Sequence, residues 1–513
     1  MRAWTLLAAL PLALAGCATS GAGVDIHPVE FATPLPIPPL QQGRGDSAHR
    51  RYTLTAEAGT HRFGPGLVSP TIGFDGDYLG PTLLMRRGDR VRVDVTNDLD
   101  EATTVHWHGL HVPARMDGGP HQMVAPGGKW HPRWTVDQPA ATLWYHPHPH
   151  GQTAQQVYRG LAGLLLIADP AHTPAALPHR YGVDDVPLVV QDKTFTDGGE
   201  LVVDPVGKVS TGFLGDTIVV NGAAGPVRDV TTEAVRLRLL NASNSRFYDF
   251  AFDDSRPFAV VASDGGLLAE PVATDHVQLS PGERAEIVVR FRPGESITLS
   301  SRHPDFGHGI EASDRFGGGG FPIVRFQAAP TLAPSPVLPR HLADVPAPDE
   351  ASARGERRFA IMGRAINGRP MDLGRIDEVV PLGQAEVWTI TNEDPQPHNF
   401  HVHDGSFRVL SVDGAPPAAV QAGYKDTVYV PPRATVKILV RFTDYADPRM
   451  PYMFHCHLLL HEDLGVMGQF VVVRPGQKVV PPSRPEATGE APEGSVMIHG
   501  GNDPTMNHDP VRR

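Results

Sequence analysis

Short apolar runs, each ended by turn residues, follow one another along most of the chain. Residues 90–97 read R-V-R-V-D-V-T-N and alternate with period two, which is typical of a strand with one buried face. Residues 161–170, L-A-G-L-L-L-I-A-D-P, form a more continuous apolar run that indicates a buried strand. The 53 Gly and 51 Pro residues supply turns and argue against long helices. We therefore predict an all-β fold built from sandwiches.

A weak internal repeat indicates how many sandwiches there are. Related runs occur at 91–98 (V-R-V-D-V-T-N-D), 235–242 (V-R-L-R-L-L-N-A) and 385–392 (A-E-V-W-T-I-T-N). A chain of 513 residues is also too long for one small domain. We predict three β-sandwich domains. The predicted segments are 1–16 (signal peptide), 17–49 (lipobox and Pro-rich tether), 50–172 (domain 1), 173–327 (domain 2), 328–355 (linker), 356–475 (domain 3) and 476–513 (flexible tail).

The first residues have the pattern of an export signal. Arg2 precedes a short apolar run that ends in small residues, and this run is too short for an ordinary membrane span. L-A-G-C at 14–17 resembles a bacterial lipobox, in which Cys17 is lipidated; the alternative is an ordinary signal with a chance cysteine. We expect an exported protein, periplasmic or cell-surface, that contacts a membrane only through a lipid anchor at Cys17.

Charge narrows the choice of partners. The formal net charge is −12, and no basic stretch is dense enough to suggest nucleic acid, so we expect no nucleic-acid partner.

The oligomeric state is expected to be a monomer, because three domains usually suffice for one.

Four histidine clusters are the strongest sign of chemistry in the chain. They are H-W-H-G (106–109), W-Y-H-P-H-P-H-G (144–151), H-N-F-H-V-H (398–403) and H-C-H-L-L-L-H (455–461). Each contains H-x-H, and on a strand residues i and i+2 point to the same face. A single such pair could be chance or a surface couple. Four pairs in one chain predict metal binding.

The H-C-H sequence points to copper in particular. Strand alternation sends His455 and His457 to one face and Cys456 to the other. Cys456 with His398 and His461 would form a His₂Cys set, which suits a blue-copper electron-transfer centre. Histidines alone would suit copper, zinc, iron or nickel, so the thiolate is what selects copper. Zinc has no redox chemistry and would not need the short electron path through Cys456.

These motifs, in this order and spacing, resemble those of the multicopper oxidases, the family of laccases, bilirubin oxidase, ascorbate oxidase and the bacterial periplasmic cuprous oxidases. The resemblance covers about residues 50–475. W-Y-H-P-H-P-H-G-Q-T (144–153) and H-C-H-L-L-L-H-E-D (455–463) look most like the bacterial laccase-like and cuprous-oxidase branch. The resemblance implies three cupredoxin-like Greek-key domains. It also implies four copper ions: one type 1, one type 2 and two type 3, held in domain 3 and between domains 1 and 3.

Position by position, the resemblance implies eleven copper ligands. They are His398, Cys456 and His461 for type 1; His106 and His401 for type 2; His108, His146 and His457 for one type 3 copper; and His148, His403 and His455 for the other. His150, the last histidine of H-P-H-P-H, is left without a ligand role. A donor would give electrons singly to type 1 copper. Four electrons would pass through Cys456 and its neighbours to the trinuclear cluster, where O₂ becomes two waters.

Two acids match family residues that supply protons to the cluster. They are Asp117 in M-D-G-G-P and Glu462 in H-E-D. The alternative for an Asp before Gly-Gly is a turn residue without a chemical role. We predict that both acids are catalytic.

The axial position of type 1 copper departs from related bacterial enzymes. Those carry a weak axial Met ten residues after the cysteine, where this chain has Val466; Met467 follows it. A regular strand would place Val466 at the copper and turn Met467 away, whereas a β-bulge could bring Met467 in. Loss of the thioether should raise the potential, as in high-potential fungal laccases.

Substrate residues also differ from those of dedicated cuprous oxidases. Those enzymes carry a Met-rich insertion, but no Met lies between Met371 and His398 here. They also place Asp and Met four and two residues before the first domain-3 histidine. This chain has Asp394, which we predict to be a catalytic-site residue, and Gln396. The expected partners are O₂ and a small organic reductant, a phenol or aromatic amine, with Cu(I) as a further possibility.

Three other functions compete with this one. The first is a metallo-oxidase for copper tolerance. The second is a copper-free family relative with a structural or division role, although such relatives have lost ligands and all eleven are present here. The third is a non-enzymatic copper-holding protein that uses the His/Met tail M-I-H-G-G-N-D-P-T-M-N-H (497–508).

Overall fold

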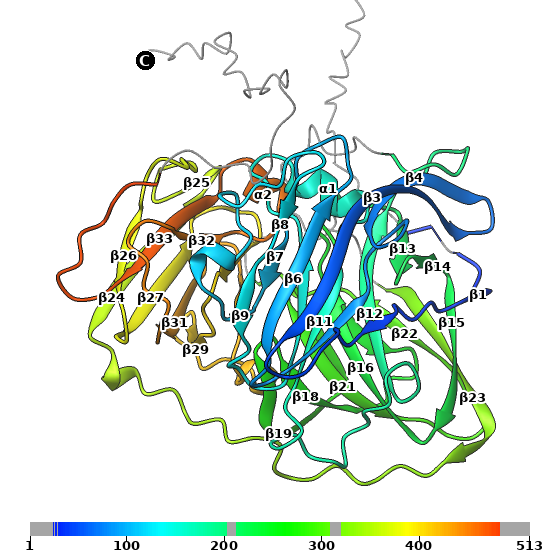
Figure 1. Ribbon diagram of the computed structural model, residues 1–513. Helices are drawn as coiled ribbons and strands as arrows, with labels where there is room; N and C mark the ends of the chain where they lie inside the picture. The colour runs from blue at the N-terminus through cyan, green and yellow to red at the C-terminus, as the bar shows by residue number, and fades with distance from the viewer. Residues whose placement is uncertain (1–23, 25, 28, 203–211, 308–319, 483–513) are drawn as a thin grey trace, which may run out of the picture.

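The computed structural model describes residues 24, 26–27, 29–202, 212–307 and 320–482. The signal peptide, Cys17 and the His/Met tail lie outside these residues. The described strands form six sheets, which pair into three sandwiches (Figure 1). No helix among the described residues is both long and apolar enough to cross a membrane.

The first sandwich packs one sheet, ordered β4-β3-β6-β8 with β9 beside β6, against another ordered β2-β5-β11-β10-β7. Its elements are β2 (Leu40–Gln41), β3 (Arg50–Gly64), β4 (Leu67–Phe74), β5 (Thr82–Arg86), β6 (Arg90–Asn97), β7 (His106–His108), a 3₁₀ turn η1 (Ala114–Met116), β8 (Lys129–Trp130), β9 (Arg133–Thr135), β10 (Ala141–His146), α1 (Thr153–Arg159) and β11 (Gly163–Ala168). In β6, Val91, Val93 and Val95 are buried while Arg90 and Arg92 are exposed, as the alternation predicts.

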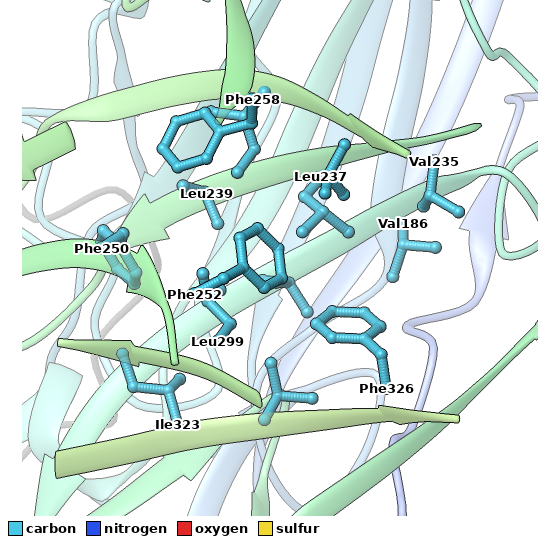
Figure 2. Close-up of a cluster of buried hydrophobic side chains, with 14 of the residues drawn as sticks. Val186, Val235, Leu237, Leu239, Phe250, Phe252, Phe258, Leu299, Ile323 and Phe326 are labelled. Carbon is cyan, nitrogen blue, oxygen red and sulfur yellow. The ribbon is translucent and has the colours of Figure 1, made fainter. Parts of the chain in front are cut away.

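The second sandwich has a seven-stranded sheet, β14-β13-β12-β16-β21-β18-β19, and a six-stranded sheet, β1-β15-β23-β22-β17-β20. Its strands are β1 (Thr33–Pro34), β12 (Asp185–Lys193), β13 (Thr217–Val220), β14 (Ala223–Ala224), β15 (Pro226–Thr232), β16 (Ala234–Asn241), β17 (Tyr248–Phe252), β18 (Phe258–Ser263), β19 (Gly266–Thr274), β20 (His276–Leu279), β21 (Arg284–Arg290), β22 (Ser296–Arg302) and β23 (Phe321–Ala333). Figure 2 shows the core between the sheets, where Leu237 and Leu239 of β16 meet Phe252 and Phe326.

The third sandwich joins the sheets β25-β24-β27-β31-β29 and β26-β33-β32-β28-β30. Its elements are β24 (Gly355–Met362), β25 (Ala365–Ile366), β26 (Glu378–Pro381), β27 (Ala385–Asn392), β28 (His398–Val402), β29 (Arg408–Val412), β30 (Thr427–Val430), β31 (Thr435–Arg441), β32 (Tyr452–His455), α2 (Leu459–Asp463) and β33 (Met467–Val473), with 3₁₀ turns η3 (Glu350–Ser352) and η4 (Ala419–Gln421).

The internal repeat corresponds to one equivalent strand in each sandwich. β6, β16 and β27 each pair in parallel with the first long strand of their own sandwich, β3, β12 and β24 respectively. Each is also antiparallel to a later strand on its other side. The three short matches in the sequence therefore reflect one topology used three times.

Strands also form inside two segments predicted as linkers. β1 and β2 of the tether pair with β15 and β5, so this part of the tether lies against the body. β23 continues to Ala333, beyond the predicted end of domain 2 at 327, because it still pairs with β15 there. Pro and Ala enrichment alone did not reveal this pairing.

Polar contacts hold the first sandwich against the third. The backbone N–H groups of Thr153 and Ala154, at the start of α1, donate to the carboxylate of Asp463 at 3.0 and 2.8 Å. His111, just after β7, lies between two carboxylates of the third sandwich, 2.7 Å from Asp404 Oδ1 and 2.6 Å from Asp444 Oδ1. Burial lowers the pKa of His111, but the two carboxylates outweigh burial and raise this pKa to about 9.

This contact predicts a pH-dependent difference in stability. The pKa of His111 is higher in the folded than in the unfolded chain, so its stabilisation is complete below pH 6.5 and is lost as the pH rises through 9. Because Asp444 is half exposed, we expect only about 1 to 2 kcal/mol between the native protein and His111→Gln at pH 6, and almost none at pH 10. Chemical denaturation across this range measures the difference. His49→Gln, at an exposed histidine, should change stability at neither pH; an equal effect of His111→Gln at pH 6 and 10 would contradict the assignment.

Candidate metal centres

Four strands bring the histidine clusters of the first and third sandwiches together. In the first, β7 and β10 are antiparallel, with His106 opposite His146. In the third, β28 and β32 place His401 opposite His455. Between the paired histidines, Trp107 and Val402 point into the apolar cores of their own sandwiches. The H-x-H alternation therefore directs the imidazoles out of each core and toward the other domain.

Two trios of buried histidines lie at this interface. In the first trio, His146 Nε2 is 3.4 Å from His108 Nδ1 and 3.4 Å from His457 Nε2. In the second, His455 Nε2 is 3.2 Å from His148 Nε2 and 3.2 Å from His403 Nε2. Each trio takes histidines from both sandwiches, so the site exists only when the two domains are docked.

A further pair, His106 and His401, completes the cluster. Both Nε2 atoms are buried and have no hydrogen-bond partner among the described residues. Their Nδ1 atoms are already used, His106 on the carbonyl of Asp117 at 3.0 Å and His401 on the carbonyl of Asp426 at 2.8 Å. One ring nitrogen of each of these two histidines lies within 4.8 Å of a ring nitrogen of His108.

The third sandwich contains a separate group of three candidate ligands, one cysteine and two histidines. Cys456 Sγ is 3.3 Å from His398 Nδ1 and 3.6 Å from His461 Nδ1, and the two nitrogens are 3.2 Å apart. Burial raises the pKa of Cys456, but His398 and His461 outweigh burial and lower this pKa to about 5, which favours the thiolate. Cys456 faces the apolar core with this group, while His455 and His457 each belong to one of the trios.

These groups fit metal ions. Two nitrogens bound at about 2.0 Å to one ion, at a tetrahedral angle, are about 3.3 Å apart, close to the separations found here. Burial, joined by the neighbouring histidines, holds the pKa of His106, His148, His403, His455 and His457 well below its ordinary value. The neutral imidazole that results is the form that binds metal. Soft thiolate with two imidazoles suits copper.

Both proposed proton-supplying acids lie beside the histidine cluster. Asp117 Oδ2 is 2.7 Å from His403 Nδ1, and its Oδ1 has no hydrogen-bond partner in the part of the chain that the structure describes. Gly118 permits this placement, because its φ is +81° and a Cβ would lie 1.8 Å from the carbonyl oxygen of Val105. The two carboxylate oxygens of Glu462 are 3.3 Å from Nδ1 of His148 and of His455. Burial raises the pKa of both acids well above its usual value.

Asp394 and Val466 lie next to the Cys456 group, whereas Met467 points elsewhere. Asp394 accepts a hydrogen bond from His398 Nε2 at 3.0 Å. The carbonyl of Val466 accepts from Cys456 N at 3.0 Å, and Val466 lies in the same apolar cluster as Cys456. Met467 instead lines a polar cavity of about 230 Å³ with Arg375, among others. His150 is exposed and belongs to none of the groups.

Asp426 and Arg284 were not predicted as site residues. The Asp426 carboxylate contacts His108 Nε2 at 3.0 Å and accepts from Arg284 Nη1 and Nη2 at 2.7 and 2.6 Å. Its main-chain carbonyl accepts from His401, so one residue orients two histidines. Burial raises the pKa of Asp426, but Arg284 outweighs burial and holds this pKa well below its usual range. In the sequence, Asp426 stands only in the run K-D-T-V at 425–428, and this run does not indicate that Asp426 pairs with Arg284.

We expect Asp426→Asn to weaken both the fold and the metal site. The change would remove the nearer of the two carboxylates that pair with buried Arg284 and leave only Asp264, at 3.7 Å, at a cost of about 3 to 5 kcal/mol. Replacing the charged acceptor of His108 by a neutral amide should lower copper affinity by about 10- to 100-fold. Thermal unfolding and metal content after dialysis measure the two effects. Asp349→Asn, at an exposed carboxylate, is the control; native copper retention by the Asp426 variant would contradict the positioning role.

Comparisons with known proteins agree with this geometry. Three family models, each described as multicopper oxidase, match residues 55–172, 184–297 and 341–476. The chain is 37% identical over 443 residues to multicopper oxidase mco of Staphylococcus haemolyticus, covering 85% of this chain and 92% of the relative. It is 38% identical over 454 residues to cell division protein FtsP of Edwardsiella tarda, with 86% and 93% covered.

Solved structures are also similar. One is a bacterial laccase-like multi-copper oxidase, CueO, from Ochrobactrum sp., with a TM-score of 0.79, 38% identity, and 86% of this chain and 100% of that chain covered. Another is a multicopper oxidase from Campylobacter jejuni described as a metallo-oxidase, with a TM-score of 0.75, 25% identity, and 88% and 98% covered. The predicted fold class is confirmed. The chain belongs to the multicopper oxidase family, whose typical members are copper-binding oxidoreductases with cupredoxin domains.

Proposed function

We propose that the protein is a laccase-like oxidase that couples one-electron oxidation of phenols or aromatic amines to four-electron reduction of O₂ to water. The observation that carries this proposal is the H-C-H strand end, where Cys456 joins one ligand group while His455 and His457 join two others. Four bound copper ions would accept single electrons from a donor at the Cys456 group and deliver four of them to O₂ at the histidine cluster.

Each ligand group has a separate task in this proposal. His398, Cys456 and His461 would hold type 1 copper. His106 and His401 would hold type 2 copper. The two trios would hold the type 3 pair. Asp117 and Glu462, beside the trios, would hold the protons that water formation consumes.

Organic donors are favoured by the residues at the Cys456 group. His398 is 2% and His461 6% exposed, so a donor would approach an imidazole edge rather than the sulfur. Asp394, 19% exposed, would orient His398 and accept a phenolic proton. Gln396 stands where cuprous oxidases have a thioether. The Ochrobactrum relative is described as oxidising lignin model compounds, which supports the same donor class.

The axial position makes a separate prediction. Val466 packs with Cys456 and Met467 turns away, so we propose that type 1 copper lacks an axial thioether. Val466→Met should then supply one and lower the potential. A redox titration of the blue band measures the potential, and Met467→Leu should leave it unchanged. A potential that moves in Met467→Leu and not in Val466→Met would reverse the assignment.

Steady-state kinetics tests the choice of donor. Copper-loaded protein should oxidise 2,6-dimethoxyphenol rapidly without added copper, and should oxidise Cu(I) with a lower kcat/KM. Fast Cu(I) oxidation, with phenol turnover only in excess copper, would instead support the metallo-oxidase function for which the Campylobacter relative is the precedent. A role in cell division, as the name of the FtsP relative indicates for that protein, is less well supported here. All eleven proposed ligand positions of this chain carry a histidine or a cysteine.

The remaining parts of the proposal concern location and state. We propose export, with a lipid anchor at Cys17 and a monomeric, three-domain body in which β1 and β2 belong to the body and the second domain extends to the end of β23 at Ala333. Mass spectrometry of the N-terminal peptide would test lipidation, since a lipidated Cys17 would be the mature N-terminus.

A further inference from the structure

A second cavity lies between the first and second sandwiches. It has a volume of about 430 Å³ and is lined by residues of β2, β5, β10, β11, β12 and β16 and of the connection 169–181. None of the eleven proposed copper ligands lines it. A volume of this size at a domain interface is typical of small-molecule sites.

The walls are mostly apolar. Leu40, Leu84, Leu166, Ile167 and Leu177 line the cavity, joined by Pro and Ala residues of the connection between the domains. A ligand would therefore bury an apolar body here, with a favourable contribution from the water that it displaces.

Buried arginines form the polar part of the lining. Arg238 is fully paired, with two hydrogen bonds to Asp185 and others to Thr142 and Glu286. Arg236 is only 4% exposed, and its Nε and Nη2 both donate to the same Glu286 oxygen. The hydrogen bonds of Arg236 to described residues run through Nε and Nη2 alone, so its Nη1 makes none there, and the side chain lines the cavity. Arg236 thus offers one N–H donor group to a ligand.

The charge of the lining favours an anion. Glu286 and Asp185 balance Arg236 and Arg238, and Asp169 is paired with Arg87 and His172. Arg86 also lines the cavity, is exposed, and forms no ion pair with a described residue. One positive charge is therefore unmatched, which suits a monoanion.

We propose that this cavity binds a small amphiphilic carboxylate, with its carboxylate between Arg236 Nη1 and Arg86 and its apolar body against the leucines. Guanidinium groups pair well with carboxylates, because the planar donors match the two oxygens. A neutral molecule of the same shape would leave Arg236 Nη1 unpaired and should bind more weakly. The site is separate from the proposed oxidase chemistry and does not depend on it.

Substitutions at the exposed opening of the cavity can change ligand binding without disturbing the metal centre. Arg238 also donates to Thr142, whose carbonyl accepts from the Arg284 that holds Asp426. Substitution of Arg238, at the buried end of the cavity, would therefore disturb the metal centre. Ala175 lines the cavity and is exposed, whereas its neighbour Ala176 does not line it. Ala175→Trp should fill the opening, and Ala176→Trp is the matched control.

The test uses the copper-loaded full-length protein, with decanoate as ligand, decanol as its neutral analogue, and the fluorescent naphthalene sulfonate ANS as reporter. Decanoate should displace ANS at a saturable site, below about 1 mM, and decanol should need at least tenfold more. Ala175→Trp should weaken decanoate binding at least tenfold, Arg86→Gln about fivefold, and Ala176→Trp not at all. Calorimetry with decanoate alone gives the stoichiometry, expected to be one.

Three results would overturn the proposal. One is equal competition by decanol and decanoate, which would mean an apolar pocket without anion recognition. A second is unchanged decanoate binding in Ala175→Trp, which would place the site elsewhere. A third is the absence of saturable binding. Unchanged circular dichroism and copper content in Ala175→Trp would show that any lost binding is not lost folding.

Discussion

Cys456→Ser is expected to abolish the blue band and to reduce oxidation of 2,6-dimethoxyphenol at least about 10³-fold. The thiolate is the soft ligand of the His398–Cys456–His461 group, and its Sγ is 3.3 and 3.6 Å from the two imidazole nitrogens. A serine hydroxyl would remain protonated, and it is a hard ligand that suits copper poorly. The backbone at Cys456 also connects this group to His455 and His457, so electrons would lose the sulfur through which they enter this path.

Metal analysis separates this effect from a loss of the fold. Neither histidine trio includes Cys456, so the variant should lose one copper ion per chain and keep the rest. His150→Gln, which alters an exposed histidine of the H-P-H-P-H run, should keep all copper and full activity. Phenol oxidation at the native rate by Cys456→Ser would show that electrons enter elsewhere.

Asp117→Asn and Glu462→Gln are expected to slow turnover by about 10²- to 10⁴-fold, the usual contribution of a positioned proton donor. The amides keep the shape of each side chain but cannot supply its proton. Neither carboxylate oxygen of Glu462 makes a hydrogen bond to a described residue, and each lies 3.3 Å from a proposed ligand histidine. Burial raises its pKa well above the usual value, so it can carry a proton near neutral pH.

Two measurements distinguish proton supply from a structural defect. Anaerobic bleaching of the blue band by a phenol reports electron entry alone, and it should be unchanged in both variants. Reoxidation by O₂ should be slow, with native copper content. The exposed Asp100→Asn serves as a control. Native reoxidation rates in both variants would exclude these acids as the proton source.

Much of this architecture could be predicted from local sequence patterns. Period-two alternation correctly placed Val91, Val93 and Val95 in the core, and the repeated run identified β6, β16 and β27 as equivalent strands. Alternation also separated Cys456 from His455 and His457, and this arrangement is kept although β32 ends at His455.

Contacts between distant segments could not be predicted in this way. Arg284 lies in the second sandwich and Asp426 in the third, yet together they hold His108 of the first. His111 meets Asp404 and Asp444 only when the first and third sandwiches dock. The unpaired Nη1 of Arg236 depends on which carboxylates the neighbouring strands present. Such partners follow from domain docking, which no local pattern in one chain records.

Oxygen consumption by the copper-loaded protein, with 2,6-dimethoxyphenol as donor and the visible spectrum recorded alongside, is the most direct test of the proposed oxidase function. We expect a thiolate-to-copper band, one O₂ consumed for four electrons taken from the donor, and no accumulation of hydrogen peroxide. A blue band without oxygen uptake from either phenol or Cu(I) would contradict the oxidase function. It would leave an electron carrier or a copper-holding protein.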